Sequence, residues 1–285
     1  MSQSRLCLLA VFLILSITAK AETGVARIPD GGVSIQNDHI AITVGSDGSL
    51  VSLLNVDTGH DYASGELLWR LYYDSPRQKE IQICGSDQVP VITSSAGVIT
   101  LTYNSLRIKE RELDIKVVLT ISLESDMVRF GSTLYNNEPE TVIREIHYPL
   151  VHGAILPKDH MLYTSEAGGK LFENPAKVLS KAQSSPYKRP EQIFRQRDVK
   201  YGYKVFMNCF GLFGENQGLY FGSHDDTFQD TWHGLRAYKG DTGKYDVLEF
   251  GFFKYPHCFC GEKWTCDANV VSPYSGTWHV ASRIY

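Results

Sequence analysis

The sequence predicts an all-β fold in which antiparallel strands form a sandwich. Apolar and polar residues alternate with a period of two in one segment after another, and short polar turns join these segments. In addition, no stretch before residue 170 has the 3.6-residue periodicity of a helix. Regular strands joined by short turns are typical of β-sandwiches.

Strands are expected from residue 33 onward. Asp47 and Gly48 form a hairpin signal between two alternating runs, and residues 57–59 form a second turn. The strands expected before the middle of the chain span residues 33–37, 39–44, 50–54, 67–73, 91–95, 98–103, 113–123, 128–135 and 141–148. Those expected afterwards span residues 203–213, 218–223, 231–238 and 246–253.

Residues 170–204 interrupt this pattern. The segment contains Pro175, Pro186 and Pro190 and is rich in lysine and arginine. A long loop inside a compact domain is usually functional or mobile. We interpret it as a solvated surface excursion or, alternatively, as a rim that approaches an acidic or sugar ligand.

The last residues, 272–285, predict a turn followed by the start of a helix. Ser275 or Thr277 can cap this helix, and Trp278, Ala281 and Ile284 follow at three-residue spacing. We therefore divide the chain into a signal peptide over residues 1–21, a β-domain over residues 22–275, and a connector over residues 276–285. The connector is expected to lead into a catalytic domain that this chain lacks.

The first 21 residues indicate export. Arg5 precedes an apolar run that extends from Leu6 to Ile17, and Ala19 and Ala21 form an A-x-A cleavage signal. The run is short for a membrane span. We expect a cleaved signal peptide, a secreted or periplasmic location, and no stable membrane insertion.

The mature chain is acidic and rich in aromatic residues. Without Arg5 and Lys20, 26 of the 28 basic residues remain against 32 acidic residues, a net charge of −6. This charge disfavours nucleic acid as a partner. Aromatic residues make up 12% of the chain, and exposed rings can stack on sugars, while buried rings are ordinary in β-sheets. Composition alone leaves both interpretations open.

Five cysteines remain after cleavage, and their pairing is open. Export permits disulfides, so a bond that includes Cys266 and a set of buried free thiols are both possible. Cys258 and Cys260, with a third cysteine six residues later, do not have a standard zinc spacing. The sequence also has no P-loop, no dinucleotide fingerprint, no H-E-x-x-H and no G-x-S-x-G. We therefore expect no metal and no cofactor. The five are Cys84, Cys209, Cys258, Cys260 and Cys266.

The sharpest candidate site is the strand end GLYFGSHDD, residues 218–226. His224, Asp225 and Asp226 follow the strand, and Trp232 and His233 come soon after. Carboxylates accept hydrogen bonds from sugar hydroxyls, imidazoles donate or accept them, and an indole ring offers a stacking face. We expect these five residues to bind carbohydrate. The alternative is that the two aspartates only form a turn.

Three motifs resemble a known module. Residues 35–62 carry N-x-x-I-x-I-x-V, then DGSL, then a strand that closes on N-x-x-TG. GLYFGSHDD is similar to the late strand of this module, and SPYSGTWHVASRIY is similar to its connector. The module is the N-terminal galactose-mutarotase-like β-supersandwich found ahead of (β/α)8 barrels in bacterial glycoside hydrolases. Within it, the chain resembles the DUF6259-type glycoside-hydrolase-like proteins over most of residues 30–285.

The resemblance implies a sandwich that shapes one wall of a sugar site, with the catalytic carboxylates on a barrel. We carry over no catalytic residue and expect an exported, non-catalytic module that binds an oligo- or polysaccharide beside a catalytic barrel domain or subunit. Two alternatives remain open: a free-standing mutarotase, epimerase or lyase, and a structural β-module that binds a protein. A mutarotase needs a His acid and a carboxylate base facing each other across the sugar C1, for which His224 and Glu249 are the candidates.

Overall fold

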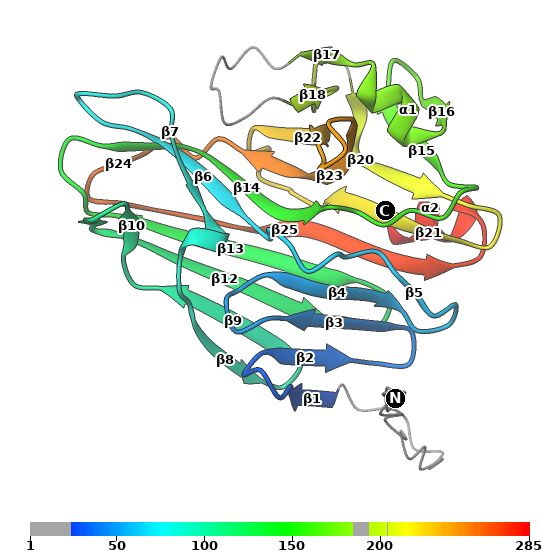
Figure 1. Ribbon diagram of the computed structural model, residues 1–285, viewed down its shortest axis with the longest axis horizontal. Helices are drawn as coiled ribbons and strands as arrows, with labels where there is room; N and C mark the ends of the chain where they lie inside the picture. The colour runs from blue at the N-terminus through cyan, green and yellow to red at the C-terminus, as the bar shows by residue number, and fades with distance from the viewer. Residues whose placement is uncertain (1–23, 185–193, 204) are drawn as a thin grey trace, which may run out of the picture.

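Three antiparallel sheets form the fold in the computed structural model, which describes residues 24–184, 194–203 and 205–285 (Figure 1). The predicted all-β class and the short C-terminal helix are confirmed. The signal peptide expected over residues 1–21 lies outside the described residues. No helix in the described ranges is long and apolar enough to cross a bilayer.

Sheet A has five strands and is formed by the first residues of the described chain. Its order is β1-β2-β3-β4-β5. The strands are β1 (Gly24–Arg27), β2 (Val33–Gln36), β3 (Ile40–Val44), β4 (Leu50–Asn55) and β5 (His60–Asp61). The hairpin predicted at Asp47 and Gly48 joins β3 to β4, and Gly48 has the positive φ of 82° that such a turn requires.

Sheet B has nine strands and carries the charged residues described below. Its order is β17-β18-β22-β23-β14-β6-β7, with β19 also paired to β22 and β24 paired to β14. The strands are β6 (Arg70–Asp74), β7 (Ile81–Cys84), β14 (Val142–His152), β17 (Gln183–Ser184), β18 (Phe194–Gln196), β19 (Val199–Lys200), β22 (Thr231–Lys239), β23 (Tyr245–Lys254) and β24 (Cys258–Phe259).

Sheet C also has nine strands, in the order β16-β15-β20-β21-β25-β13-β12-β9-β8. The strands are β8 (Val91–Ser95), β9 (Val98–Tyr103), β12 (Ile115–Leu123), β13 (Val128–Asn136), β15 (Met161–Glu166), β16 (Lys170–Glu173), β20 (Val205–Phe213), β21 (Gln217–Ser223) and β25 (Glu262–Ser275). A separate hairpin of β10 (Leu106–Ile108) and β11 (Arg111–Leu113) precedes β12, and a 3-10 turn, η1 (Gly85–Asp87), follows β7.

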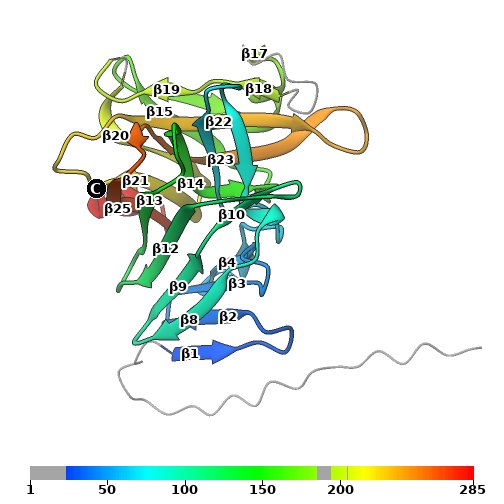
Figure 2. The ribbon, with the colours of Figure 1, turned by 90° about the vertical axis from the view of Figure 1, so that its left-hand side faces the viewer.

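One continuous apolar core joins the three sheets. Strand β12 shows why, because its buried and partly exposed residues alternate along its whole length, as a strand with one face on a core must. Sheet A packs against sheet C through β3 and β4 on β25 and through β2 on β9 (Figure 2). Phe250 and Phe252 of sheet B join the same core as Phe210 and Phe221 of sheet C.

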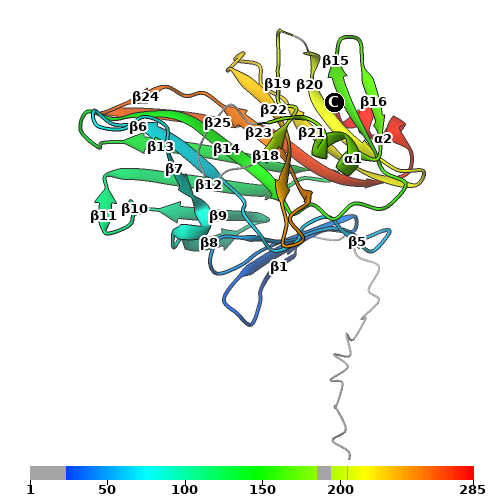
Figure 3. The same ribbon diagram turned by 45° about the horizontal axis from the view of Figure 1, so that its top comes forward.

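The outward face of sheet C carries the second helix. This helix, α2 (Trp278–Ile284), lies at the chain end beside β21 and β25, where Ala281 and Ile284 are buried against Tyr220 and Tyr274 (Figure 3). Thr277, one of the two predicted caps, is its N-cap residue, but the Thr277 side chain makes no capping hydrogen bond.

Two segments differ from the expectations. The expected loop over residues 170–204 contains the strands β16, β17, β18 and β19 and the short helix α1 (Pro175–Ser180), whose N-cap Asn174 accepts a hydrogen bond from the backbone N–H of Lys177. Residues 272–275, expected to form a turn, instead end the 14-residue strand β25. Ser272 and Tyr274 stay in register with β21 there, so pairing to a neighbouring strand overrides the local turn signal.

Candidate functional site

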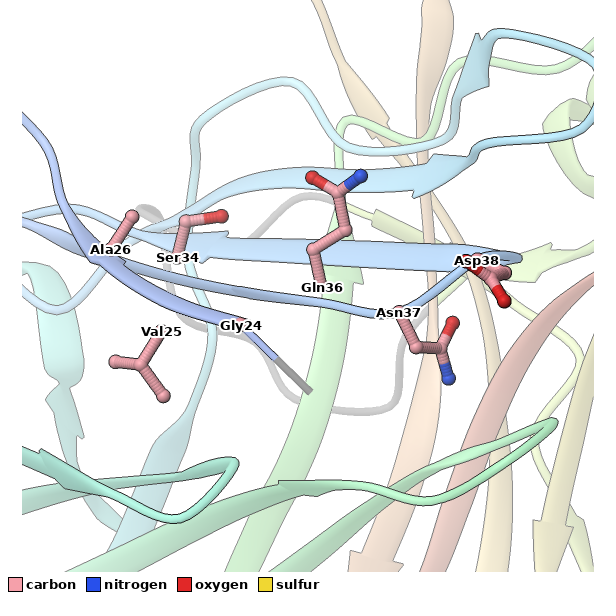
Figure 4. Close-up of a pocket in the computed structure, with 7 residues that line it drawn as sticks. All are labelled: Gly24, Val25, Ala26, Ser34, Gln36, Asn37 and Asp38. Atoms are coloured by element: carbon pink, nitrogen blue, oxygen red, sulfur yellow. The ribbon is translucent and has the colours of Figure 1, made fainter. Parts of the chain in front are cut away.

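Two of the hollows on the surface of the described residues differ in the chemistry of their walls. The first, of about 320 Å³, lies beside β1 and the turn before β3, and Asp38 is the only titratable residue in its lining (Figure 4). It therefore offers no acid–base pair. Its lining consists of Gly24, Val25, Ala26, Ser34, Gln36, Asn37 and Asp38.

The second hollow, of about 610 Å³, lies between α2 and the outward face of sheet C. Its wall includes Met161, Met207 and Phe213 from sheet C and Trp278 and Tyr285 from the C-terminal segment. This largely apolar lining can pack against the apolar face of a sugar ring, but it offers few hydrogen-bond partners for the hydroxyl groups of a sugar.

Asp225, one of the predicted site residues, has a structural role in a hydrogen-bonded turn and a buried ion pair. One carboxylate oxygen of Asp225 accepts hydrogen bonds from the backbone N–H of Thr227 at 2.8 Å and from its hydroxyl at 2.6 Å. The other accepts one from Lys254 Nζ at 3.0 Å. The Lys254 and Asp225 side chains are only 1% and 4% exposed, so the carboxylate is engaged in the turn and in a buried ion pair. Asp226, next to it, is exposed.

His224 and His233 lie in different environments. His233 is fully buried: its Nε2 lies 3.1 Å from Asn208 Oδ1, and burial, assisted by Lys254, lowers its pKa to about 3. It is therefore a neutral core residue. His224 is partly buried on the outward face of sheet C, where its Nε2 lies 3.0 Å from the hydroxyl of Tyr220.

Trp232 lies on the outward face of sheet B, since it alternates along β22 with the core residues Leu235 and Ala237. It is partly exposed, and its ring centroid lies 6.0 Å from that of Tyr255. His224 and Trp232 therefore occupy outward faces of two different sheets. The structure does not bring the five predicted residues together on one surface.

A second group of polar residues does share one face of sheet B. In β23, Leu248, Phe250 and Phe252 point into the core, so Glu249 points outward. There the Arg70 guanidinium of β6 donates a hydrogen bond to Glu249. Both side chains are almost completely buried, with 4% and 1% exposed. A buried charge is tolerated only when it is paired in this way.

His152 and two further side chains complete the surroundings of Glu249. The Nδ1 of His152 lies 2.7 Å from Glu249 Oε2, and its Nε2 lies 3.1 Å from Glu66, whose side chain is about half exposed. The Tyr238 hydroxyl donates to Glu249 at 3.1 Å and accepts from Arg70 at 2.5 Å. Burial alone would raise the pKa of Glu249, but Arg70 and His152 outweigh it and lower the pKa to about 2.

A stack of rings and one cation continues along the same face. The Arg236 guanidinium lies 4.1 Å from the centroid of the Phe253 ring, and the His147 ring stacks on the same phenyl ring at 3.7 Å. Arg236 Nη2 donates to Asp198 at 2.7 Å. Gly234 is required beneath this stack, because a Cβ atom there would overlap the Phe253 ring.

Glu145 marks the far end of this face. Its Oε2 lies 3.0 Å from His147 Nε2, and its side chain is 14% exposed, while that of His147 is 1% exposed. Burial raises the pKa of Glu145 to about 7, although Arg236 opposes the shift. Burial, with Arg236 and Arg70, lowers the pKa of His147 well below 6.5. The pair therefore holds a neutral imidazole beside a carboxyl group that titrates near neutral pH.

Three buried nitrogen atoms on this face lack a hydrogen-bond partner among the described residues. They are Arg70 Nε, Arg236 Nη1 and His147 Nδ1. A buried donor or acceptor without a partner costs about 1–3 kcal/mol, and buried polar groups in native proteins nearly always have partners. We name the outward-facing residues that surround these atoms the charged face. It consists of Glu66, Arg70, Glu145, His147, His152, Asp198, Arg236, Tyr238, Glu249 and Phe253.

Charged residues inside apolar strands were a sequence signal for the charged face, and this signal was not used in predicting the site. Arg236 stands between Leu235 and Ala237, and Glu249 stands between Leu248 and Phe250, so each charge interrupts an apolar strand. The candidate pair of His224 and Glu249 is not brought together, because the two residues lie on outward faces of different sheets.

None of the five described cysteines is disulfide-bonded. Within the described ranges, no cluster of three or more His, Cys, Asp or Glu residues is arranged to hold a metal ion.

Solved structures share this fold. A galactose mutarotase-like protein from Lactobacillus casei matches with a TM-score of 0.51 at 9% identity, over 86% of this chain and 100% of its own. A putative aldose 1-epimerase from Escherichia coli K12 matches with a TM-score of 0.53 at 9% identity, over 86% of this chain and 98% of its own. An alpha-mannosidase from Enterococcus faecalis matches at 0.50 and 12% identity, over 88% of this chain and 30% of its own.

No protein-family model matches the chain, and a search of curated proteins found no match. At these identities the structural likeness shows the fold alone. The fold is a galactose mutarotase-like β-sandwich, as the sequence motifs implied. The narrower resemblance to the DUF6259-type proteins stays a prediction.

Proposed function

We propose that this chain is an exported, non-catalytic carbohydrate-binding module and that the charged face of sheet B is its sugar site. The observation that carries the proposal is a row of partly exposed polar side chains on one face, Glu145, His152 and Glu66, beside the buried ion pairs of Arg70 and Arg236. A polyhydroxylated ligand supplies hydroxyl oxygens as acceptors and hydroxyl protons as donors in one molecule.

The charges of the face favour a neutral sugar. Each buried arginine already has a carboxylate partner, Glu249 for Arg70 and Asp198 for Arg236. The arginines therefore contribute little uncompensated positive charge to the face. Trp232, at the edge of the same face, supplies an aromatic surface for the apolar face of a pyranose ring.

The affinity of a single sugar for this face is expected to be modest. Each neutral hydrogen bond contributes about 0.5–1.5 kcal/mol net, and association itself costs several kcal/mol. We expect a Kd near 1 mM, which corresponds to about −4 kcal/mol.

NMR titration of the full mature chain with a panel of neutral monosaccharides tests the proposal. Trp232→Ala and His152→Ala are expected to weaken binding at least fivefold while their thermal melts show a folded protein. Glu173→Ala is the matched control, because Glu173 is exposed on β16 at the edge of sheet C. Sugar-induced shifts that map to His224 and α2 and survive both site substitutions would place the site elsewhere. An absence of shifts with every sugar would refute carbohydrate binding.

The export and assembly parts of the proposal rest on the sequence. Residues 1–21 have the pattern of a cleaved signal peptide, and N-terminal sequencing of the protein from its native host tests whether the mature chain begins at Glu22. A catalytic barrel domain or subunit and the DUF6259-type lineage are proposed on the resemblance described above.

A second candidate function is an aldose 1-epimerase, because the charged face carries both a histidine and a carboxylate, His152 and Glu249; their direct contact would have to open to admit the sugar C1. In that reaction a base removes the proton from the C1 hydroxyl and an acid protonates the ring oxygen. The C1–O5 bond then opens to the aldehyde, which rotates and closes on its other face. The low pKa of Glu249 opposes this role, because it makes the carboxylate a weak base. Polarimetry on freshly dissolved α-D-glucose distinguishes the two candidate functions. Catalysed mutarotation that is lost in His152→Ala would establish the epimerase.

A further inference from the structure

The charged face is longer than one sugar ring. His152 pairs with Glu249, and His147 pairs with Phe253, so these two positions are four steps apart along β23. Glu145 lies a further two residues along β14. At about 3.3 Å per residue, the backbone positions of the His152 and Glu145 ends are roughly 20 Å apart.

Each end of the face has its own acid–base pair. At one end His152 bridges Glu249 and Glu66. At the other end His147 contacts Glu145 at 3.0 Å, and its Nδ1 is one of the buried nitrogens without a partner. Phe253 lies opposite His147 at one end and Arg236 lies opposite Glu249 at the other, and the Arg236 guanidinium reaches over the Phe253 ring.

We propose that Glu145, positioned by His147, forms a second sugar subsite, so that the charged face binds an oligosaccharide of at least two units. This inference rests on the proposed carbohydrate function and deepens it. The 14% of the Glu145 side chain that remains exposed is the part that contacts the ligand. Its Oε2 faces His147, which leaves Oε1 to accept a hydrogen bond from a hydroxyl of the second unit.

The neighbours of Glu145 make this contact sensitive to pH. Arg236 and Arg144 favour its ionised form, whereas burial, Glu80 and Asp198 favour its protonated form. The further polar neighbours are Tyr72, paired to it on β6, and His147 on its own strand. Because the ionised carboxylate is the stronger acceptor, the contribution of the second subsite is expected to rise between pH 6 and pH 8.

The experiment compares ligands of increasing length on the full mature chain. Calorimetric or NMR titrations use gluco- and manno-oligosaccharides of one to four units at pH 8. We expect wild type to gain about tenfold in affinity from one unit to two, which corresponds to one charged hydrogen bond of about 1.4 kcal/mol. Glu145→Ala is expected to gain less than twofold from one unit to two. Glu173→Ala, exposed on sheet C, serves as the control.

A second variant separates a subsite from a folding defect. Glu145→Gln keeps a group that can accept a hydrogen bond but removes the titration. It is expected to retain part of the gain with length and to lose the pH dependence between pH 6 and 8. Equal affinity for one and two units in wild type, or an equal loss for both lengths in Glu145→Ala, would overturn the second subsite and leave the proposed function standing. Failure of every sugar to bind would overturn both.

Discussion

Replacement of Arg70 with methionine tests the charged face most directly. The substitution leaves the Glu249 carboxylate buried, with only His152 and Tyr238 as hydrogen-bond partners. The pKa of Glu249, lowered from 4.5 to about 2, corresponds to about 3 kcal/mol in favour of the ionised form. Breaking a buried ion pair from one side usually costs about 3–5 kcal/mol. We therefore expect Arg70→Met to lower the free energy of unfolding by about 3–5 kcal/mol at pH 7.

The pH dependence of that loss identifies its cause. In wild type, the lowered pKa of Glu249 means that its stabilising contribution is complete above pH 4.5 and disappears as the pH falls toward 2. Without Arg70, burial raises the pKa of the same carboxyl above 4.5, so protonation then favours the folded state. The difference in unfolding free energy between wild type and Arg70→Met should therefore shrink as the pH falls from 7 to 4.

Urea unfolding of both proteins at pH 7, 5.5 and 4 measures this difference. Glu249→Gln is the companion variant, since it removes the charge that Arg70 compensates. The double variant Arg70→Met/Glu249→Gln is expected to be more stable at pH 7 than Arg70→Met alone. A difference below about 1 kcal/mol that does not change with pH would show that Glu249 is solvated, and it would refute the buried ion pair.

Two further predictions concern parts of the fold outside the charged face. Asp225→Ala leaves the Lys254 ammonium buried without its carboxylate and should lower the free energy of unfolding by about 3–5 kcal/mol. Asp226→Ala, at an exposed position, should change it by less than about 0.5 kcal/mol. Equal thermal melts for the two variants would contradict the buried pair. Ile284→Ala should cost about 2–4 kcal/mol because Ile284 is 6% exposed, while Trp278→Ala, at a residue 53% exposed, should cost much less. Hydrogen exchange that is fast throughout α2 in wild type would show instead that the helix frays and contributes little to the core.

The alternation of apolar residues predicted most of the strands, because a strand that buries one face must place every second side chain in the core. Strand β12 and the hairpin at Asp47 and Gly48 follow this rule and lie where it places them. Strand β25 does not alternate over residues 268–274, because one face there lies in the main core and the other is covered by α2. Its pattern therefore gave no period-2 signal, and a Pro-Tyr-Ser-Gly stretch at its end resembled a turn.

By itself, the sequence determined the antiparallel β class, the terminal helix and the mutarotase-like layout of the motifs, because these depend on residues close together in the chain. The charged face was decided by tertiary structure. Arg70 and Glu249 are 179 residues apart in the chain, and they meet because β14 pairs with β6 on one side and with β23 on the other. Conversely, the adjacent residues Trp232 and His233 point to opposite sides of β22, since neighbouring side chains in a strand alternate. Proximity in sequence therefore grouped residues that the sheet separates, and strand pairing brought together residues that no local pattern connects.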